Sequence, residues 1–457
     1  MVVLYRRLAL GALGLGVCVA AACGDSTPPK DLPTGETAAP PRGDPPGTVT
    51  DGGTTPLDAA LDDEDGGDGG FTLVTRDVNH VLGTGQSLSV GAQGAPVLST
   101  TQPLDSLMFN TGPVAGGTGL ASFVPLVERS LETMSSSFAA LSTQMAETEL
   151  LVGLPPPRNK HRMLVSVHGL GGIAYVGLKK GTAAYANGIA QVAAGKKITS
   201  DMGLTYIVRA VTNVHGESDH VSRNATYAKD LAEWQADYDR DVRAITLQRT
   251  PIPMLQTQMS SWTRYGQAQS LIPQAQLDAH VDNPGKVILV GPKYHLPYAI
   301  DGVHLTNQGY REMGEQYAKV YRAVILEGKT WEPVRPKSAT LVGTDIIVEM
   351  HAPAPPLVFD TQRVTAVANM GFELFSGAAR PPLITSVTLT GPTTVKVALA
   401  AAPPAGSRLR YAFTGTPNAR AGTQTGPRGN LRDSDATKSR NGYALFNWCV
   451  HFDVPVQ

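Results

Sequence analysis

Cysteine is scarce in this chain of 457 residues, with only Cys18, Cys23 and Cys449 present. Their wide spacing excludes the thiolate cluster of a zinc site. The first two lie in a predicted targeting segment, which leaves Cys449 as the single thiol of the mature chain. No internal disulfide is therefore expected, and stability must come from burial. We expect Cys449 itself to be a buried core residue.

Stretches rich in lysine and arginine are also missing. The chain has 38 Lys and Arg against 39 Asp and Glu, which gives a formal net charge of -1. Without a basic stripe, no nucleic-acid partner is expected. A content of 42% hydrophobic and 17% charged residues is typical of a globular protein, and the length exceeds one ordinary domain.

The apolar stretch from Leu8 to Ala22 is too short to span a bilayer as a stable helix. Arg6 and Arg7 precede it, and small residues lead up to Cys23, as in an export signal that resembles a bacterial lipobox. We predict a signal peptide over residues 1–22, a lipid on Cys23 that attaches the protein to a membrane, and a location in the bacterial cell envelope at the outer membrane. Ordinary cleavage after the alanine run, with secretion, is the alternative.

Residues 23–72 are predicted to be a disordered tether, because Pro, Gly, Thr and Asp dominate and few large apolar residues occur. Such a segment would hold a folded domain away from the membrane surface. Its acidic run at 62–65 is either a calcium ligand set or, the reading we favour, a solvated stretch.

Strand and helix signals alternate through residues 73–328, which we assign to one folded domain. This alternation predicts an α/β fold with a parallel sheet covered on both faces and a site at the carboxyl ends of the strands. The expected strands are Val78–Leu82, Met163–Val167, Leu204–Val214, Ile252–Gln256 and Val287–Val290, and the expected helices are Phe123–Met145, Thr182–Ala194, Tyr227–Leu247 and Tyr310–Leu326.

After residue 328 the pattern changes to short runs of period two separated by turn residues. This pattern predicts a small all-β, sandwich-like domain over residues 329–457. Trp448, Tyr411 and Tyr443 could stack on a sugar, although aromatic residues in small β domains more often belong to the core.

Three residues far apart in the sequence can form a nucleophilic site. Ser87 follows the first predicted strand within a glycine-rich turn, and Asp301 and His304 precede a predicted helix. A serine hydroxyl needs an imidazole to take its proton and a carboxylate to orient that imidazole. Ser87, His304 and Asp301 can fill these roles, which predicts a serine hydrolase of the esterase kind.

Three blocks resemble the SGNH hydrolases, and within them the carbohydrate acetylesterase branch related to sialate O-acetylesterases. They are GTGQSLSVG at 83–91, HGESD at 215–219 and DGVHLT at 301–306, in the family's order. The resemblance covers about residues 73–328 and implies a flavodoxin-like three-layer fold. His215 stands where this branch usually has glutamine, and Leu88 where it usually has asparagine.

An oxyanion hole is expected from the Ser87 N–H and from the N–H of Gly171 or Gly172, where the family has a Gly-Gly. Preorganised donors of this kind contribute roughly 3 to 4 kcal/mol each to transition-state stabilisation in serine hydrolases. Gln86 is placed with the oxyanion and substrate-binding residues, and His215 either donates to the oxyanion or stacks in the pocket.

The remaining acidic and histidine side chains in and after the second block are not assigned to the triad or to the oxyanion hole. Glu217 and Asp219 are expected to brace the serine loop rather than to act as acid and base. His220 is expected at the surface or lining a pocket. A metal site formed by His215, Asp219 and His220 fits poorly beside a serine triad, so no metal and no cofactor are expected.

The favoured function is removal of O-acetyl groups from carbohydrate through an acetyl-serine intermediate. The alternatives are an esterase or lipase acting on other short-chain esters, and a surface lipoprotein that binds glycan without catalysis. The block His168–Gly172 is similar to the oxyanion loop of α/β-hydrolases, but no GxSxG elbow occurs, and Ser87 precedes this block instead of following it.

Overall fold

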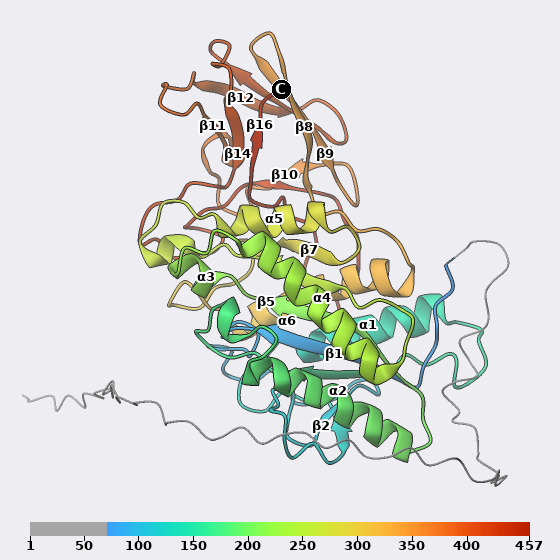
Figure 1. Cartoon of the computed structure of the whole chain (residues 1–457). Helices are drawn as coiled ribbons and strands as arrows, with labels where there is room; N and C mark the ends of the chain where they lie inside the picture. The colour runs from blue at the N-terminus through green and yellow to red at the C-terminus, as the bar shows by residue number, and fades with distance from the viewer. Residues whose placement is uncertain (1–70) are drawn as a thin grey trace, which may run out of the picture. The chain divides into compact units, whose positions relative to one another are not determined.

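The computed structural model describes residues 71–457 (Figure 1). The predicted signal peptide at 1–22, the lipidation site Cys23, the acidic run and all but the last two residues of the predicted tether lie outside the described residues. Among the helices of residues 71–457, none has both the length and the apolar character that a membrane crossing requires.

A seven-stranded sheet forms the centre of the first part of the chain, in the order β3-β2-β4-β1-β5-β6-β7. All neighbouring strands pair in parallel except β2 and β3. The strands are β1 Val78–Gly85, β2 Leu107–Phe109, β3 Phe123–Pro125, β4 Met163–Val167, β5 Tyr206–Val214, β6 Met254–Gln258 and β7 Val287–Pro292. Strands β2 to β4 lie on one side of β1, and the strands that follow them in the chain, β5 to β7, lie on its other side. Such a switch in strand order is where ligands bind in open parallel sheets.

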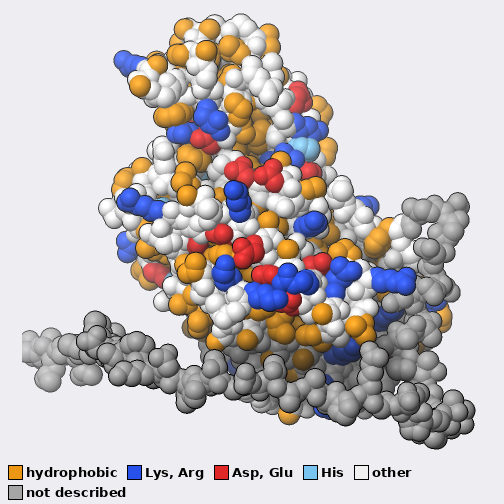
Figure 2. All heavy atoms as spheres, in the orientation of Figure 1, with side chains coloured by type: hydrophobic (Ala, Val, Ile, Leu, Met, Phe, Trp, Pro, Cys, Tyr) orange, Lys and Arg blue, Asp and Glu red, His pale blue; other side chains and the backbone are white. Residues whose placement is uncertain are grey.

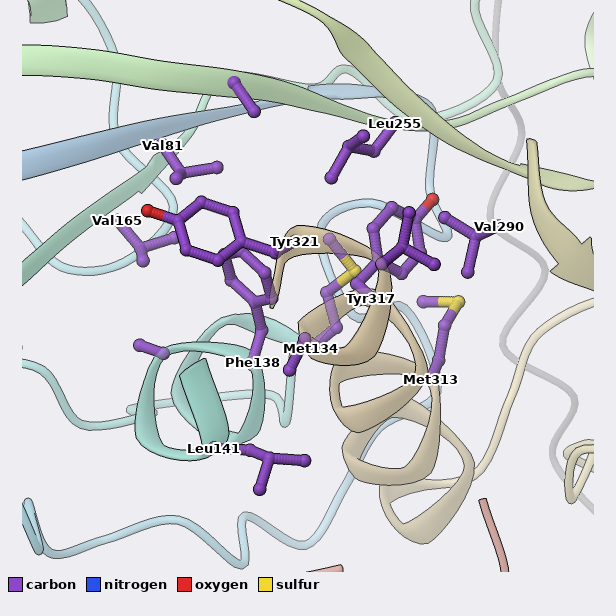
Figure 3. Close-up of a cluster of buried hydrophobic side chains, with 14 of the residues drawn as sticks. Val81, Met134, Phe138, Leu141, Val165, Leu255, Val290, Met313, Tyr317 and Tyr321 are labelled. Carbon is purple, nitrogen blue, oxygen red and sulfur yellow. The ribbon is translucent and has the colours of Figure 1, made fainter. Parts of the chain in front are cut away.

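Helices cover both faces of this sheet. Helices α1 (Ser135–Met145) and α6 (Asn307–Tyr321) pack together on one face, where Phe138 and Tyr317 meet Val81 and other strand residues (Figure 3). Helices α2 (Ala183–Asp201) and α4 (Tyr227–Thr246) cover the other face, and α5 (Ile272–Asp282) lies beside α4 (Figure 1). The predicted combination of a mainly parallel sheet with helices is therefore confirmed.

Short helical segments complete the description of residues 71–457. They are η2 Ala146–Leu150, η3 Tyr175–Gly177, α3 Glu217–Val221, η4 Trp262–Tyr265, η5 Arg322–Leu326 and η6 Ala368–Gly371. Of these, α3 follows β5 and η4 follows β6, so both lie at the carboxyl ends of central strands.

The helix predicted over Phe123–Met145 is wrong in its first half. Phe123–Pro125 forms strand β3 instead, and α1 begins only at Ser135. Pro125 explains the difference, because proline disfavours the helical conformation of the residue before it and has no N–H to donate. The apolar spacing that suggested one long helix belongs to a strand, an irregular segment and a shorter helix.

Antiparallel strands form the C-terminal part, as expected. One sheet has the order β12-β13-β9-β8, a second β11-β14-β16, and β10 pairs with β15. The strands are β8 Arg335–Val342, β9 Asp345–His351, β10 Val358–Phe359, β11 Phe372–Phe375, β12 Ile384–Leu389, β13 Thr394–Leu399, β14 Arg408–Tyr411, β15 Leu431–Arg432 and β16 Phe452–Pro455.

The two larger antiparallel sheets share one hydrophobic core. Tyr411 and Trp448 are buried in this core, as is Cys449, which confirms the core prediction for the thiol. The same cluster includes Leu289 and Tyr294 of the first part, so the C-terminal strands pack directly on the α/β part. The proposed domain boundary near residue 329 stays a prediction.

Acidic and basic side chains are intermixed on the face that α2 and α4 present in Figure 2. Several of them form ion pairs between the two helical regions, such as Lys179 with Glu233 at 3.1 Å and Lys180 with Asp241 at 2.7 Å. Exposed pairs of this kind contribute little to stability, on the order of 0 to 1 kcal/mol each.

Candidate active site

Ser87 lies in the tight turn that follows β1, at the carboxyl edge of the sheet. The turn depends on Gly85, whose φ is +125° and where an added Cβ would lie 2.3 Å from the Val214 carbonyl oxygen. Only glycine fits this approach between β1 and β5. The Ser87 side chain is therefore directed away from the strand and remains partly exposed.

Asp301 and His304 reach Ser87 from the loop that precedes α6. The His304 Nε2 atom lies 2.7 Å from the Ser87 Oγ, and the His304 Nδ1 atom lies 2.6 Å from Asp301 Oδ2. Thr306 caps the helix by accepting a hydrogen bond from the Gly309 N–H at 3.1 Å, which fixes where the loop ends. The structure thus brings the three predicted residues together in hydrogen-bonding order.

The Asp301 carboxylate is held in place by its own loop. Its Oδ1 atom accepts hydrogen bonds from the backbone N–H groups of Val303 and His304, both at 3.0 Å. Burial alone raises the pKa of Asp301, but these donors and the His304 ring lower it below its ordinary value overall. The carboxylate therefore stays ionised at neutral pH and can orient the imidazole.

Two backbone N–H groups beside the Ser87 side chain have no described partner. A Cβ placed on Gly171 would lie 3.6 Å from the Ser87 Cβ, so the two backbones approach closely. Within residues 71–457, the N–H groups of Ser87 and Gly171 have no hydrogen-bond partner. At Gly172 an added Cβ would meet no atom within 4 Å. Of the two glycines, Gly171 is therefore the one that lies against Ser87.

His215 does not face the serine, contrary to one of its two predicted roles. Its side chain is fully buried, with Nε2 at 3.0 Å from the Ile173 carbonyl oxygen and Nδ1 at 2.7 Å from the Tyr227 hydroxyl. Burial lowers the pKa of His215, so the ring is neutral and has a single N–H. That N–H donates to Ile173, which leaves none for an oxyanion.

Gln86 is likewise occupied by the protein itself. Its side-chain amide donates to Glu217 Oε2 at 3.0 Å, and its Oε1 accepts from the Ser218 N–H at 3.1 Å. With 2% of its surface exposed, Gln86 cannot also bind substrate. The predicted substrate-binding role is corrected: Gln86 ties the serine turn to the start of α3.

Glu217 is the centre of a buried polar cluster under the serine turn. Besides Gln86, it accepts hydrogen bonds from Ser261 Oγ at 2.9 Å and from the Lys293 ammonium at 3.2 Å. Burial raises the pKa of Glu217, but the Lys293 charge and these hydrogen bonds lower it overall. The cluster links the segments after β1, β5, β6 and β7, which agrees with a bracing role.

Asp219 braces a different segment. Its Oδ2 atom accepts from the Tyr175 N–H at 2.8 Å and its Oδ1 atom from the Asn224 amide at 2.6 Å. It therefore holds the chain that follows Gly171 and Gly172, not the serine turn itself.

Replacing Lys293 by methionine is expected to lower the free energy of unfolding by about 3 to 5 kcal/mol, because Glu217 would be left buried without its counter-ion. The loss should grow as pH rises above about 4, the ordinary range of a glutamate pKa. The lowered pKa of Glu217 stabilises the native protein only above that range, whereas the unpaired carboxyl of the variant binds a proton instead. Urea unfolding at pH 4 and pH 8 measures both effects.

The matched control is Lys197→Met, because Lys197 forms an exposed pair with Asp201 at 2.6 Å. This change should cost no more than about 1 kcal/mol. Equal losses for the two variants would show that the Lys293–Glu217 pair contributes no more than a surface pair.

A loop of the C-terminal part contacts the segment that bears Asp301. The Ala421 N–H donates to the Gly302 carbonyl at 3.1 Å, and the Asn418 N–H donates to the Thr263 carbonyl of η4 at 2.7 Å. Arg264 in turn donates to the Asp301 carbonyl at 2.8 Å. This loop therefore helps to position the aspartate of the site.

Several of these residues were missed by sequence reasoning. Lys293 could have been noticed, because a lysine directly after an apolar strand is unusual in a buried segment. Arg264 and the loop at 418–421 give no local signal, since their contacts join segments far apart in the chain.

The fold and the site define an α/β protein that has the hydrogen-bonded Ser–His–Asp arrangement of serine hydrolases. Neither a protein-family model nor a curated protein sequence matches the chain. Among solved structures, it is similar to a carbohydrate acetylesterase from Xanthomonas citri, with 16% identity, a TM-score of 0.53, and coverage of 82% of this chain and 80% of that chain. This likeness establishes a shared fold.

Two further matches cover a smaller share of this chain. A protein from Arabidopsis thaliana is 16% identical, with a TM-score of 0.37 and coverage of 53% of this chain and 97% of that one. A carbohydrate acetylesterase from Sinorhizobium meliloti is 12% identical, with a TM-score of 0.31 and coverage of 54% and 99%. Scores at this level support no argument about the fold.

Proposed function

We propose that the protein is a serine esterase of the SGNH type, with a flavodoxin-like catalytic domain and a sandwich-like C-terminal domain. The observation that carries the proposal is the chain of contacts in which Asp301, His304 and Ser87 are joined by hydrogen bonds of 2.6 and 2.7 Å. Such a chain activates a hydroxyl for attack on an acyl carbonyl.

In the proposed reaction, His304 Nε2 takes the hydroxyl proton as Ser87 Oγ attacks the ester carbonyl carbon. The N–H groups of Ser87 and Gly171 stabilise the oxyanion of the tetrahedral intermediate. The bond to the alcohol oxygen then breaks, and His304 gives its proton to this leaving oxygen. Water attacks the acyl-serine by the same steps, which releases the acid and restores Ser87.

The proposed acyl group is acetyl and the proposed substrate class is O-acetylated carbohydrate. The three sequence blocks support this choice, as does the description of the Xanthomonas citri protein as a carbohydrate acetylesterase. Lipid attachment at Cys23 and a place in the cell envelope remain part of the proposal and are supported by the residues that precede this cysteine.

A fluorophosphonate probe tests the proposed nucleophile directly, because it forms a stable bond only with an activated serine. We expect one probe per chain, attached to Ser87. In a separate assay, p-nitrophenyl acetate should be hydrolysed at least about 10-fold faster than p-nitrophenyl octanoate, since a small acyl site excludes long chains. Peptide mass spectrometry locates the label. The matched control is Ser200→Ala, which removes an exposed serine of α2 and should still be labelled.

Label on another serine would contradict the proposed nucleophile. Faster hydrolysis of the octanoate would favour an esterase or lipase of longer acyl chains over an acetylesterase.

A further inference from the structure

A cavity of about 400 Å³ lies between α3 with the turn after it and the segment from η4 to Ile272. These two walls follow β5 and β6, and both strands lie in the sheet between β1, which precedes Ser87, and β7, which precedes the Asp301 loop. The cavity therefore belongs to the same carboxyl edge as the Ser–His–Asp site, where ligands bind in sheets of this kind.

Both walls are attached to the segments that carry the site. Ser218, at the start of α3, donates its N–H to Gln86, the residue before Ser87, at 3.1 Å. Arg264 of η4 donates to the carbonyl oxygen of Asp301 at 2.8 Å. One wall of the cavity is thus joined by a hydrogen bond to the serine turn, and the other to the aspartate loop.

The lining of the cavity combines an aromatic ring with amide side chains. Tyr265 is 38% exposed, and its ring centroid lies 5.9 Å from that of the buried His220. Gln267 is exposed, and its amide makes no hydrogen bond within the described part of the chain. Asn224 and Gln269 also line the cavity, but the Asn224 amide already donates to Asp219 and Asp230, and the Gln269 amide donates to the Thr414 hydroxyl. Exposed Val221 and Leu271 add apolar surface to the same lining.

The Tyr265 ring, the Gln267 amide and the apolar side chains suit a ligand that combines C–H surface with hydroxyl or ester groups. Amides can both donate to and accept from a hydroxyl, and an aromatic face packs against the C–H groups of a sugar ring. An acetyl group needs no cavity of this size, because it adds only two carbons to the reacting ester. The space is better explained by the alcohol part of the ester.

We propose that this cavity binds the sugar alcohol of the ester, with Tyr265 and Gln267 as the residues that determine the substrate class. The inference rests on the proposed esterase function and deepens it, because it assigns the leaving group to a place outside the Ser–His–Asp site. Neither residue takes part in the chemical step. Both act on how well a sugar ester is held for attack.

The test compares two acetyl esters that differ in the alcohol, glucose pentaacetate and p-nitrophenyl acetate, with the full chain and its Tyr265→Ala and Gln267→Ala variants. We expect kcat/KM for glucose pentaacetate to fall about 5- to 10-fold more than kcat/KM for p-nitrophenyl acetate in each variant, mainly through KM, in line with the loss of one hydrogen bond or ring contact. Gln362→Ala, an exposed glutamine elsewhere, should change neither rate.

Two results would overturn the inference while leaving the esterase proposal intact. One is an equal fall for both esters in the two variants, and the other is hydrolysis of p-nitrophenyl acetate by the unaltered protein without hydrolysis of glucose pentaacetate. If the unaltered protein hydrolyses neither ester and matches Ser87→Ala, the proposed function itself fails, and the inference fails with it.

Discussion

Replacement of Ser87 by alanine is expected to lower kcat/KM for p-nitrophenyl acetate by about 10^4- to 10^6-fold, the range found when triad residues are removed from other serine hydrolases. The variant loses the hydroxyl oxygen that lies 2.7 Å from His304 Nε2 and would attack the carbonyl. Without it, the remaining N–H groups at residue 87 and Gly171 can still polarise an ester, so a small residual rate is expected.

The Ser87→Ala change should lower the reaction rate without lowering the stability of the protein, because Ser87 contributes little to folding. Its side chain is partly exposed, and its described hydrogen bond is the one to His304. Thermal unfolding of Ser87→Ala should therefore match that of the unaltered protein, with a difference in free energy within about 0.5 kcal/mol. A clear rate that stays within 10-fold of the unaltered protein would show that another group is the nucleophile. If neither protein hydrolyses the ester faster than buffer does, the glycan-binding alternative is favoured.

Five of the parallel strands could be predicted from the sequence because each contains a short run of apolar residues and is buried along nearly its whole length, whereas the three-residue strand β2 was missed. Met163–Val167 matches its prediction at both ends, and the other four differ by a few residues. The Ser–His–Asp contact could be predicted for a related reason: Ser87 directly follows β1 and the Asp301 loop lies between β7 and α6, so one edge of the sheet collects them.

The surroundings of the site could not be predicted in the same way. The resemblance noted in the sequence implied an oxyanion donor at the position of His215, yet the His215 N–H donates to Ile173, a residue 42 positions earlier. Similarly, Lys293 pairs with Glu217 across 76 positions. Such contacts depend on how loops that follow different strands meet in space. The spacing of residues within one segment does not predict which loops will meet.

The helix wrongly expected at Phe123–Pro125 shows the opposite limitation. The apolar residues of the segment from Phe123 onward are spaced three and four apart by coincidence, and Pro125 was a sign against a helix at its start. The segment instead adds β3 to the edge of the sheet in the antiparallel direction. Backbone restrictions of single residues decided this element, not the spacing of apolar side chains.

Replacement of Asp301 by asparagine is expected to lower kcat for p-nitrophenyl acetate by about 10^4-fold, with KM changed far less. The asparagine carbonyl can still accept from the N–H groups of Val303 and His304, so the loop should keep its shape. Its NH2 group would then face His304 Nδ1, which must become an acceptor. The proton moves to Nε2, and that nitrogen can no longer take the proton of Ser87.

The pH dependence separates this mechanism from a loss of structure. Since the pKa of Asp301 is lowered, the native carboxylate stays ionised from neutral pH down to below about 4, the ordinary range for aspartate, and is lost only as pH falls through the lowered pKa, so any loss of activity at higher pH belongs to another group. The asparagine variant has no such carboxylate and should be slow throughout. Asp345→Asn, at a partly exposed aspartate 3.5 Å from Lys396, is the matched control and should keep the native profile. A loss below 10-fold in Asp301→Asn would mean that the carboxylate does not set the tautomer of His304.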